Sequence, residues 1–289
     1  MSRPRLTPPA DPPAPTRLPR TDQFAGRTAV VTGAGLGIGA GIARAVAYHG
    51  ARVLLVDVDE AAVRATARRI VADGSPEPSV LVADVTDPAT PGAVRTAVED
   101  GADLLVNNVG DYRPSGPFLD LPPDNWRRMY ALNLEHVLAV THALLPAMVA
   151  RRRGAVVNVS SVEGMRGIPG NAVYGAFKAA LIAFTASLAA EVGQYGVRVN
   201  AIAPDFTDTP QTPMWAAIDA RYADHVGRWV PVGRFGHPVD HGDAAVFLLG
   251  EQSAFVTGET LRVDGGTLAA PGWYRRDETR FTNLPRPLS

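Results

Sequence analysis

The segment Thr32-Gly33-Ala34-Gly35-Leu36-Gly37-Ile38-Gly39 follows a short apolar run and leads into a stretch with helical spacing. Its glycines permit a tight turn and let backbone N–H groups approach a pyrophosphate, which would face the N-terminus of the following helix. A second apolar run, ending at Asp57, follows at the distance that a β-α-β unit requires. The segment therefore predicts a dinucleotide-binding fold whose phosphate loop contains Gly33, Gly35, Leu36, Gly37, Ile38 and Gly39.

Apolar runs rich in Val, Ile and Leu alternate with helix-length segments along most of the chain. The predicted strands are 29–31, 53–58, 80–85, 104–106, 155–159, 197–203 and 260–263. The predicted helices cover about 38–49, 59–72, 88–98, 123–151, 171–194 and 238–249. Short and continuously apolar strands are typical of a buried parallel sheet. The alternation predicts an α/β fold of Rossmann type, a single domain with a doubly wound parallel sheet of about seven strands and helices on both faces.

Three further segments lie outside this alternation. Residues 1–23 contain seven prolines and four arginines without apolar periodicity, so we expect a flexible tail before a catalytic domain at 24–268. Residues 269–289 form a C-terminal tail. Residues 205–235 follow a predicted strand end, where ligands bind in open α/β sheets. A substrate loop is favoured there over ordinary surface packing by the large side chains of Met214, Trp215, Tyr222, Trp229 and Phe235.

The composition restricts the class of protein. The chain has 289 residues, 46% hydrophobic and 20% charged, with a net charge of -1, which indicates a soluble globular protein and argues against nucleic-acid binding. The absence of cysteine excludes disulfides, thiolate metal ligands and cysteine nucleophiles, and no metal site is predicted. No apolar run reaches the roughly 18 residues of a membrane helix, and the N-terminus lacks a secretory signal pattern. We therefore expect a cytoplasmic enzyme with a small-molecule partner and no membrane contact.

Lysine occurs once in the chain. Of the 28 basic residues, 27 are arginine and the other is Lys178. Codon bias accounts for an arginine excess, but arginine is permanently charged whereas the pKa of a lysine can move. Lys178 follows Tyr174 by four residues in a predicted helix, so the two side chains share a face. A cation beside a phenol lowers its pKa from about 10 and favours acid/base chemistry near neutral pH.

Three polar features accompany this pair. Ser161 follows the predicted strand 155–159 and precedes Tyr174 by thirteen residues. Asn133 lies among apolar neighbours in a long predicted helix, and Asn107-Asn108-Val109-Gly110 closes the fourth strand. Each has a structural alternative: a cap for Ser161, a satisfied buried amide for Asn133 and a turn for the asparagine pair. Their order along the chain favours one common site.

Asp57 ends the second predicted strand, eighteen residues after Gly39. A carboxylate there accepts hydrogen bonds from the adenosine ribose hydroxyls and repels a 2′-phosphate. No basic residue stands at Leu36 or directly after Asp57. NAD is therefore favoured over NADP as the cofactor. The alternative is that Asp57 caps the following helix.

On these residues the sequence resembles the classical short-chain dehydrogenase/reductase family over about residues 26–268. The matching motifs are TGAGLGIG at 32–39, Asp84-Val85, NNVG at 107–110, Asn133, Ser161, Tyr174-Gly175-Ala176-Phe177-Lys178, Arg198-Val199-Asn200 before Pro204, and Val263-Asp264-Gly265-Gly266. The resemblance implies a homotetramer and a catalytic set of Ser161, Tyr174, Lys178 and Asn133.

The resemblance also implies a role for each position. Tyr174 would exchange the proton of the substrate hydroxyl, and Ser161 would orient the substrate oxygen. Lys178 would lower the tyrosine pKa, hold the nicotinamide ribose and pass protons on, and Asn133 would hold a relay water. Cofactor contacts are implied for Asp84, Val85, Asn108, Gly110, Tyr174, Lys178, Pro204 and Thr209.

The sequence departs from the family pattern at Val109, Phe177 and Asp205, where Ala, Ser and Gly are usual. Asp205 puts a carboxylate, on a residue that disfavours positive φ, near the expected nicotinamide site. Glu163, two residues after Ser161, has two interpretations: a substrate contact or an exposed turn glutamate.

These residues together predict an NAD-dependent oxidoreductase that interconverts a secondary alcohol and a ketone by hydride transfer. The alternatives are an NADH-dependent ketoreductase of a biosynthetic pathway and a nucleotide-binding scaffold without turnover. The apolar side chains after residue 205 suggest a hydrophobic or cyclic alcohol, although loops of this kind are reused freely on one fold.

Overall fold

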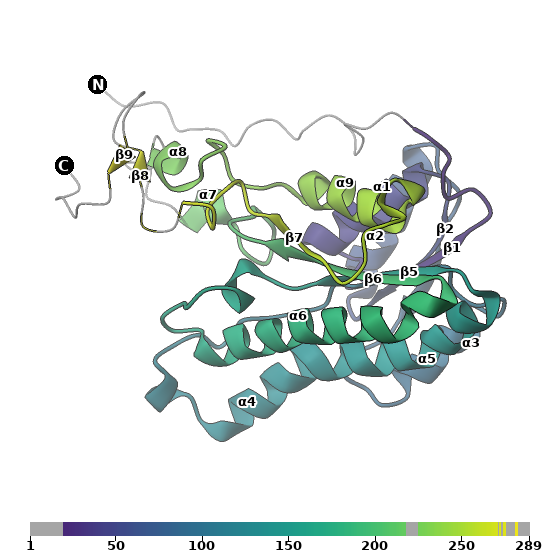
Figure 1. The fold of residues 1–289 in the computed structure, drawn as a ribbon, viewed down its shortest axis with the longest axis horizontal. Helices are drawn as coiled ribbons and strands as arrows, with labels where there is room; N and C mark the ends of the chain where they lie inside the picture. Colours follow the sequence, from purple (N-terminus) through teal and green to yellow (C-terminus); the bar gives the residue numbers. More distant parts are fainter. Residues whose placement is uncertain (1–19, 218–224, 271, 273, 276–280, 283–289) are drawn as a thin grey trace.

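Valine, leucine and isoleucine fill the centre of the molecule, where they form a seven-stranded parallel sheet (Figure 1). The structure is a computed structural model and describes residues 20–217, 225–270, 272, 274–275 and 281–282. The strand order is β3-β2-β1-β4-β5-β6-β7, and every neighbouring pair is parallel. The strands are β1 (Thr28–Thr32), β2 (Arg52–Asp57), β3 (Ser79–Val82), β4 (Leu104–Asn107), β5 (Gly154–Val159), β6 (Val197–Pro204) and β7 (Thr260–Val263).

Helices cover both faces of this sheet (Figure 1). One face carries α1 (Gly37–Tyr48), α2 (Glu60–Ala72) and α9 (Pro238–Leu249). The other carries α3 (Thr90–Ala97), α4 (Pro123–Tyr130), α5 (His136–Arg151) and α6 (Ala172–Val192). The predicted doubly wound Rossmann-type fold is confirmed. The strand order changes direction between β1 and β4, which is the switch point at which such sheets bind ligands.

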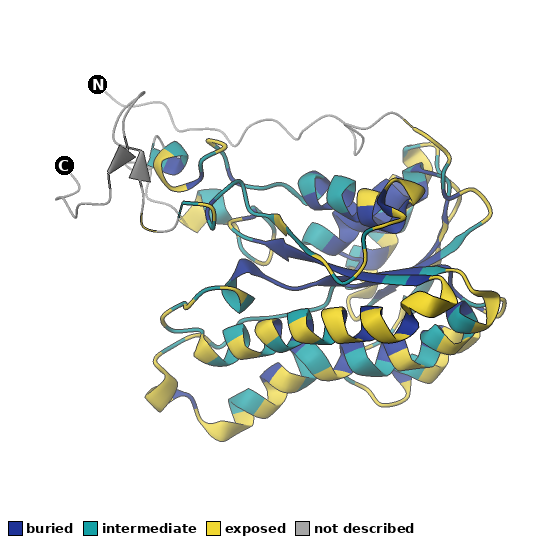
Figure 2. Ribbon diagram, viewed as in Figure 1, coloured by how far each residue is buried: buried dark blue, intermediate teal, exposed yellow. Residues whose placement is uncertain are grey.

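Side-chain alternation along the strands divides the apolar core into two clusters. Val31 on β1 points to the cluster under α1 and α9, and its neighbour Val30 points to the cluster under α3, α5 and α6. Both valines are fully buried, as are most residues of the central strands (Figure 2). The sheet is therefore a rigid platform, and the loops at the carboxyl ends of its strands are held in place by two packed layers.

Some predicted boundaries differ from the structure. The third strand ends at Val82 instead of residue 85, because Asp84 forms a turn in which its Oδ1 accepts from the Thr86 N–H (2.8 Å). The helix predicted at 123–151 is interrupted by a π-helical turn, Ala131–Glu135, with Asn133 at its centre. Such turns are frequent at functional sites. A two-stranded hairpin, β8 (Tyr274–Arg275) and β9 (Phe281–Thr282), was not predicted.

The predicted substrate loop contains two short helices, α7 (Met214–Ala217) and α8 (Val226–Trp229). The rings of Trp215 and Phe235 meet edge to face at 4.8 Å, within a small apolar cluster separate from the two main ones. These side chains therefore form a core for the loop itself. Tyr222, which was predicted to belong to it, lies outside the described residues.

The segments predicted as tails are described in part. Residues 1–19 and most of 269–289 lie outside the described residues. At the end of the predicted N-terminal tail, Thr21 contacts the His49 ring through its hydroxyl (3.0 Å), and the Arg20 guanidinium lies 5.7 Å from the Tyr48 ring centroid. Residues 20–23 thus pack on the end of α1, and in the structure the folded part begins before residue 24.

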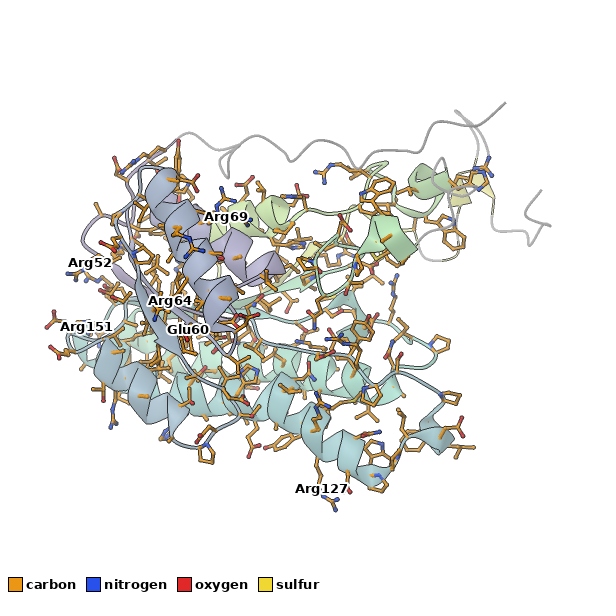
Figure 3. The ribbon with its side chains drawn as sticks, turned by 180° about the vertical axis from the view of Figure 1, so that it is seen from behind. Arg52, Glu60, Arg64, Arg69, Arg127 and Arg151 are labelled. Atoms are coloured by element: carbon orange, nitrogen blue, oxygen red, sulfur yellow. The ribbon has the colours of Figure 1, made fainter. Side chains whose placement is uncertain are left out.

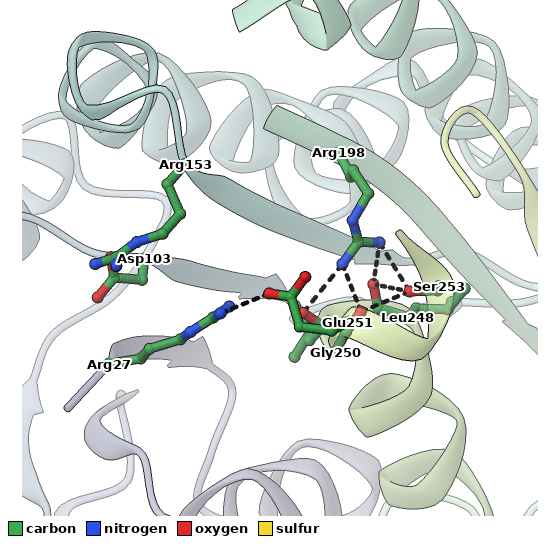
Figure 4. A network of polar contacts seen from close by, with 9 residues as sticks. Arg27, Asp103, Arg153, Arg198, Leu248, Gly250, Glu251 and Ser253 are labelled. Carbon is green, nitrogen blue, oxygen red and sulfur yellow. Dashed lines mark hydrogen bonds and ion pairs between the residues drawn. The ribbon is translucent and has the colours of Figure 1, made fainter. Parts of the chain in front are cut away.

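Arg198, in the Arg198-Val199-Asn200 motif, joins β6 to the end of α9 (Figure 4). Its guanidinium donates to the carbonyls of Leu248 (2.6 Å), Leu249 (3.1 Å) and Gly250 (2.9 Å), the acceptors that a helix C-terminus leaves unsatisfied. A neighbouring ion pair joins Arg27 to Glu251 at 2.6 Å. The motif is therefore structural, and it fixes β6, whose far end enters the site.

The helical stretches Pro123–Arg151 and Ala172–Tyr195 are long and apolar enough to cross a membrane by length and composition alone. The expectation that no stretch of the chain reaches that length is therefore wrong. Both pack on the sheet, and α5 contributes Leu144 and Met148 to its core. Only 39% and 28% of their most apolar windows are buried, so much of their apolar surface is uncovered in the single chain (Figure 2). Apolar surface that one chain leaves uncovered is available to pack against another copy in the expected homotetramer.

Candidate active site

A cleft of about 740 Å³ opens at the carboxyl ends of the strands, at the switch point of the sheet. Most of the predicted site residues line it: Gly33, Leu36, Gly37, Ile38, Asp57, Asp84, Val85, Asn108, Gly110, Ser161, Glu163, Tyr174, Lys178, Pro204 and Thr209. Three predicted residues, Gly35, Gly39 and Asn133, do not. The structure thus joins the predicted cofactor end and the predicted catalytic end in one cavity.

The glycine loop is shaped by close approaches that a side chain would prevent. Gly33 has a positive φ of +64°, and a Cβ there would lie 2.7 Å from the Asn108 Nδ2. A Cβ at Gly39 would lie 2.0 Å from the Gly33 carbonyl oxygen, so Gly39 lets α1 pack against the loop. Asn108 completes the turn, since its amide donates to the Thr32 and Gly33 carbonyls (both 3.1 Å). Gly39 is therefore a packing residue, whereas Gly33 faces the cleft.

Asp57 is bound to the same loop. Its Oδ2 accepts from the Gly35 N–H (2.7 Å) and its Oδ1 from the Asp59 N–H (2.9 Å). The cap of α2 is Asp59, whose carboxylate accepts from the Ala62 N–H, so the N-cap alternative for Asp57 is wrong. Asp57 lines the cleft beside Leu36, with its orientation fixed by backbone donors.

Lys178, the only lysine, is buried in α6 with 2% of its surface exposed. By contrast, all the arginines labelled in Figure 3 lie in exposed positions. The Lys178 Nζ donates to the Val159 carbonyl (3.0 Å), and burial lowers the pKa of this ammonium to about 8. A Cβ at Gly110 would lie 2.8 Å from the Nζ, so a glycine in the asparagine-rich loop leaves room for the lysine tip.

Tyr174 is half-buried one turn before Lys178, and the Nζ lies 5.6 Å from its ring centroid. Burial and the Glu163 carboxylate raise the pKa of Tyr174 above its usual value, while a hydrogen bond with Ser161 lowers it. The expectation that Lys178 depresses the tyrosine pKa is not met in this structure. The reason is geometric: the ammonium is turned toward the Val159 carbonyl, and the phenol is desolvated.

The side chains of Ser161 and Asn133 each form hydrogen bonds that fix backbone segments of the site. The Ser161 hydroxyl accepts from the Glu163 N–H (3.2 Å), which makes it the cap of the short helix η3 (Val162–Gly164) as well as a partner of Tyr174. Asn133 is fully buried; its amide donates to the Asp111 and Met129 carbonyls (both 2.9 Å), and its Oδ1 accepts from the Asp111 N–H (3.1 Å). Its side chain therefore fixes the loop after β4 from behind the cleft.

Two residues outside the predicted set, Tyr112 and Gln211, also shape the site. The Tyr112 ring meets the Tyr174 ring edge to face at 6.3 Å. The Gln211 amide donates to the Gly110 carbonyl (3.1 Å), which links the substrate loop to the opposite wall of the cleft. The signal for Tyr112 was its place two residues after the NNVG motif. Nothing in the sequence indicated that Gln211 would reach across.

The three departures from the family pattern have local explanations. Val109 packs against Gly33, and Phe177 packs against Tyr130 with ring centroids 5.8 Å apart. Asp205 accepts hydrogen bonds from the Arg166 guanidinium (2.9 Å) and the Thr267 hydroxyl. Its φ is not positive, since among the described non-glycine residues only two others have positive φ. The expected backbone difficulty at Asp205 is therefore absent.

Glu163 lines the cleft and is half-buried, so the interpretation as an exposed turn residue is wrong. Its Oε2 is buried and, in the described part of the chain, has no hydrogen-bond partner. Burial and the Asp205 carboxylate raise the pKa of Glu163 to about 7, whereas Arg166 and Lys178 oppose this rise. An unpartnered acid with a shifted pKa in a cleft is typical of a functional position.

Replacing Glu163 by Gln is expected to stabilise the protein at pH 8 and not at pH 5. The pKa of Glu163 is about 7 in the folded state and 4.5 ordinarily. Its contribution to the free energy of unfolding is therefore most favourable below pH 4.5, and it is lost as the pH rises through 7. The uncharged glutamine side chain avoids this loss of unfolding free energy, which is on the order of 2 kcal/mol above pH 7. Thermal unfolding at the two pH values measures it, with the exposed Glu191→Gln as control. Equal effects at both pH values would contradict the assignment.

The family model described as enoyl-(acyl carrier protein) reductase matches residues 33–267, which contain the whole cleft. The chain belongs to the classical short-chain dehydrogenase/reductase family. It is similar to the oxidoreductase UcpA of Escherichia coli (strain K12), with 37% identity over 254 residues that span 85% of this chain and 95% of the relative.

Two solved structures give the same relationship in three dimensions. A 3-oxoacyl-[acyl-carrier protein] reductase from Brucella melitensis with bound NAD has a TM-score of 0.76 and 35% identity, over 86% of this chain and 93% of that one. The corresponding reductase from Agrobacterium tumefaciens C58 with NADP bound has a TM-score of 0.78 and 32% identity, over 84% and 94%. Members of this dehydrogenase/reductase family with similar folds thus carry either dinucleotide.

Proposed function

We propose that this protein is an NAD-dependent oxidoreductase that interconverts a secondary alcohol and a ketone. The observation that carries the proposal is the convergence of Ser161, Tyr174 and Lys178 in one cleft with a glycine loop and Asp57. The cleft volume of about 740 Å³ is in the range of small-molecule and cofactor sites. NAD, when bound, accepts or returns a hydride; the side chains of the cleft provide the rest.

Each catalytic side chain has one task in this proposal. Ser161 and the Tyr174 hydroxyl hold the substrate oxygen, and they stabilise the charge that develops on it. Tyr174 takes up the hydroxyl proton during oxidation and returns it during reduction. Lys178 holds a ribose hydroxyl and exchanges protons, which a group with a pKa near 8 does readily at neutral pH. Asn133 positions the loop that carries Gly110 and keeps the space for the lysine tip.

The side chains fit a dinucleotide. A Cβ at Gly35 would lie 2.9 Å from the Asp57 Oδ2, so only a bare backbone fits between the loop and the acid. Asp57 faces the cleft beside Leu36, and no basic side chain stands at either of these positions to receive a 2′-phosphate. Asp84 and Val85 line the same end of the cleft, where an adenine ring would lie. These features favour NAD over NADP.

We expect kcat/KM with NAD to exceed that with NADP by about a hundredfold, since a carboxylate facing a phosphate costs several kcal/mol. Asp57→Asn keeps an acceptor for the Gly35 N–H and removes the charge, so the preference is expected to narrow. Both dinucleotides are compared on one active alcohol by NADH or NADPH absorbance. A wild-type preference for NADP would overturn the role given to Asp57.

A second candidate function is an NADH-dependent ketoreductase of a biosynthetic pathway. It is favoured by the two solved structures named as 3-oxoacyl-[acyl-carrier protein] reductases, which match most of this chain. A non-catalytic scaffold is less well supported, because Ser161, Tyr174 and Lys178 are all present and line the same cleft. Panels of secondary alcohols with NAD and of 3-oxoacyl thioesters with NADH distinguish the two enzymatic alternatives. Binding of NAD without turnover of either panel would favour the scaffold.

The proposed enzyme is a cytoplasmic homotetramer. The uncovered apolar surface of the helical stretches Pro123–Arg151 and Ala172–Tyr195 supports association between copies. Size-exclusion chromatography with light scattering measures the assembly, and a monomer at micromolar concentration would contradict it.

A further inference from the structure

The substrate end of the cleft contains an acid that the proposed hydride transfer does not use. Glu163 follows Ser161 by two residues, and its backbone is fixed, because its N–H donates to the Ser161 hydroxyl. The η3 turn lies close against α6: a Cβ at Gly175 would lie 2.9 Å from the Glu163 carbonyl, and one at Gly164 would lie 2.7 Å from the Lys178 carbonyl carbon. The backbone of Glu163 is thus fixed, and its side chain lines the cleft.

The cation nearest to Glu163 along the chain is already occupied. Arg166 pairs with Asp205 at 2.9 Å, and Asp205 is itself buried, with 6% of its side chain exposed. Asp205 stands where the family usually has glycine. This second carboxylate therefore attracts Arg166 and leaves the Glu163 Oε2 buried, with no hydrogen-bond partner among the described residues. Such an arrangement costs stability unless a ligand supplies a donor.

The reacting oxygen must lie close to this acid. The Glu163 charge raises the pKa of Tyr174, and Ser161 contacts both the Tyr174 hydroxyl and the Glu163 backbone. A substrate oxygen held by Ser161 and Tyr174 therefore has the Glu163 carboxyl group as a neighbour. A donor on the carbon next to the carbinol carbon would therefore lie on the Glu163 side of the cleft.

We propose that Glu163 binds a second hydroxyl group of the substrate, so that the enzyme prefers vicinal diols to simple secondary alcohols. This inference rests on the proposed alcohol dehydrogenase function. A hydroxyl fits better than an ammonium group, because the Lys178 ammonium and the Arg166 guanidinium already face this acid and would repel a further cation. A hydroxyl donates directly to the ionised carboxylate, and this charge-assisted hydrogen bond is stronger than the one it makes with the protonated acid.

The test compares kcat/KM for cyclohexanol, the vicinal diol of cyclohexane and the corresponding amino alcohol, each with NAD. The wild type is expected to prefer the diol about tenfold or more, as a hydrogen bond to a charged acceptor provides. Glu163→Gln keeps an acceptor and should lose most of that preference, and Glu163→Leu should lose all of it. Any effect of the lost Glu163 charge on Tyr174 acts on both alcohols, so the measure is the ratio of their kcat/KM values. Glu191→Gln, the same exchange outside the cleft, should keep the wild-type ratio.

The pH dependence gives a second readout. Groups facing Glu163 are Asp205 at the end of β6, Arg166 after η3, and Tyr174 and Lys178 on α6. Titration of Tyr174 and Lys178 affects both alcohols, so the ratio of the two kcat/KM values follows Glu163. The preference for the diol should weaken below about pH 7, and Glu163→Gln should abolish this change.

The outcomes separate this inference from the proposed function. If Tyr174-dependent turnover is found, but diol and cyclohexanol are oxidised equally well, the inference is wrong and the proposed function stands. The same holds if Glu163→Gln slows both alcohols equally, or if the amino alcohol is preferred. If the wild type oxidises no alcohol, or if turnover survives in Tyr174→Phe, the proposed function fails and the inference with it.

Discussion

Replacing Tyr174 by Phe is expected to reduce kcat for alcohol oxidation by roughly a thousandfold, within the range that a positioned acid/base contributes. The substitution removes one hydroxyl group and keeps the ring, its edge-to-face contact with Tyr112 at 6.3 Å and the helix that carries it. Thermal stability and NADH affinity should therefore stay close to the wild-type values. Stopped-flow or steady-state NADH formation measures the loss.

The matched control is Tyr195→Phe, which removes the same hydroxyl from an exposed turn outside the cleft. It should have no effect on kcat. A Tyr174→Phe enzyme with a rate within a few-fold of wild type would show that another group moves the substrate proton, and the proposed mechanism would be wrong.

Replacing Lys178 by Arg is expected to reduce turnover by about a hundredfold or more, although the positive charge is kept. The site has no room for a guanidinium group, because the Nζ already lies 3.0 Å from the Val159 carbonyl and a Cβ at Gly110 would be only 2.8 Å away. A guanidinium also cannot release a proton near neutral pH, whereas the pKa of Lys178 is lowered to about 8.

Lys178→Met separates charge from proton transfer. If charge alone sufficed, the arginine variant would retain activity and the methionine variant would lose it. We expect both to lose activity, with unfolding temperatures showing that both variants fold. High turnover by Lys178→Arg would contradict a proton-carrying role for this residue.

Much of the fold was predictable because local patterns determine it. Alternating apolar runs and helical segments gave all seven strands of the parallel sheet, and the glycine loop gave its switch point. The π-helical turn around Asn133 was not predictable, since it depends on how that amide satisfies Asp111 and Met129 after the helix has packed. The predicted end of β3 was wrong for a similar reason. The Asp84 side chain accepts a hydrogen bond from the Thr86 backbone N–H and so forms a turn where the strand was expected to continue.

The candidate site likewise contains some neighbours that the sequence predicted and some contacts that it did not. Residues that share a strand end or a helix face, such as Tyr174 and Lys178, were brought together as predicted. The pairing of Arg166 with Asp205 joins positions far apart in the sequence, and no spacing indicates it. The direction of the Tyr174 pKa also depends on burial and on Glu163, which only the folded arrangement supplies.

The single buried lysine also makes the chain a reporter of its own unfolding. Only one ε-amine exists in the protein, and 2% of that residue's surface is exposed in the folded state. Lys178 also lines the cleft, so the rate at which an amine-directed reagent labels it measures how often its amine becomes accessible, either from the cleft or by local opening of α6. Ligands that occupy the cleft should slow this reaction, and mass spectrometry of proteolytic peptides would follow the adduct at Lys178 separately from any adduct at an N-terminal α-amine.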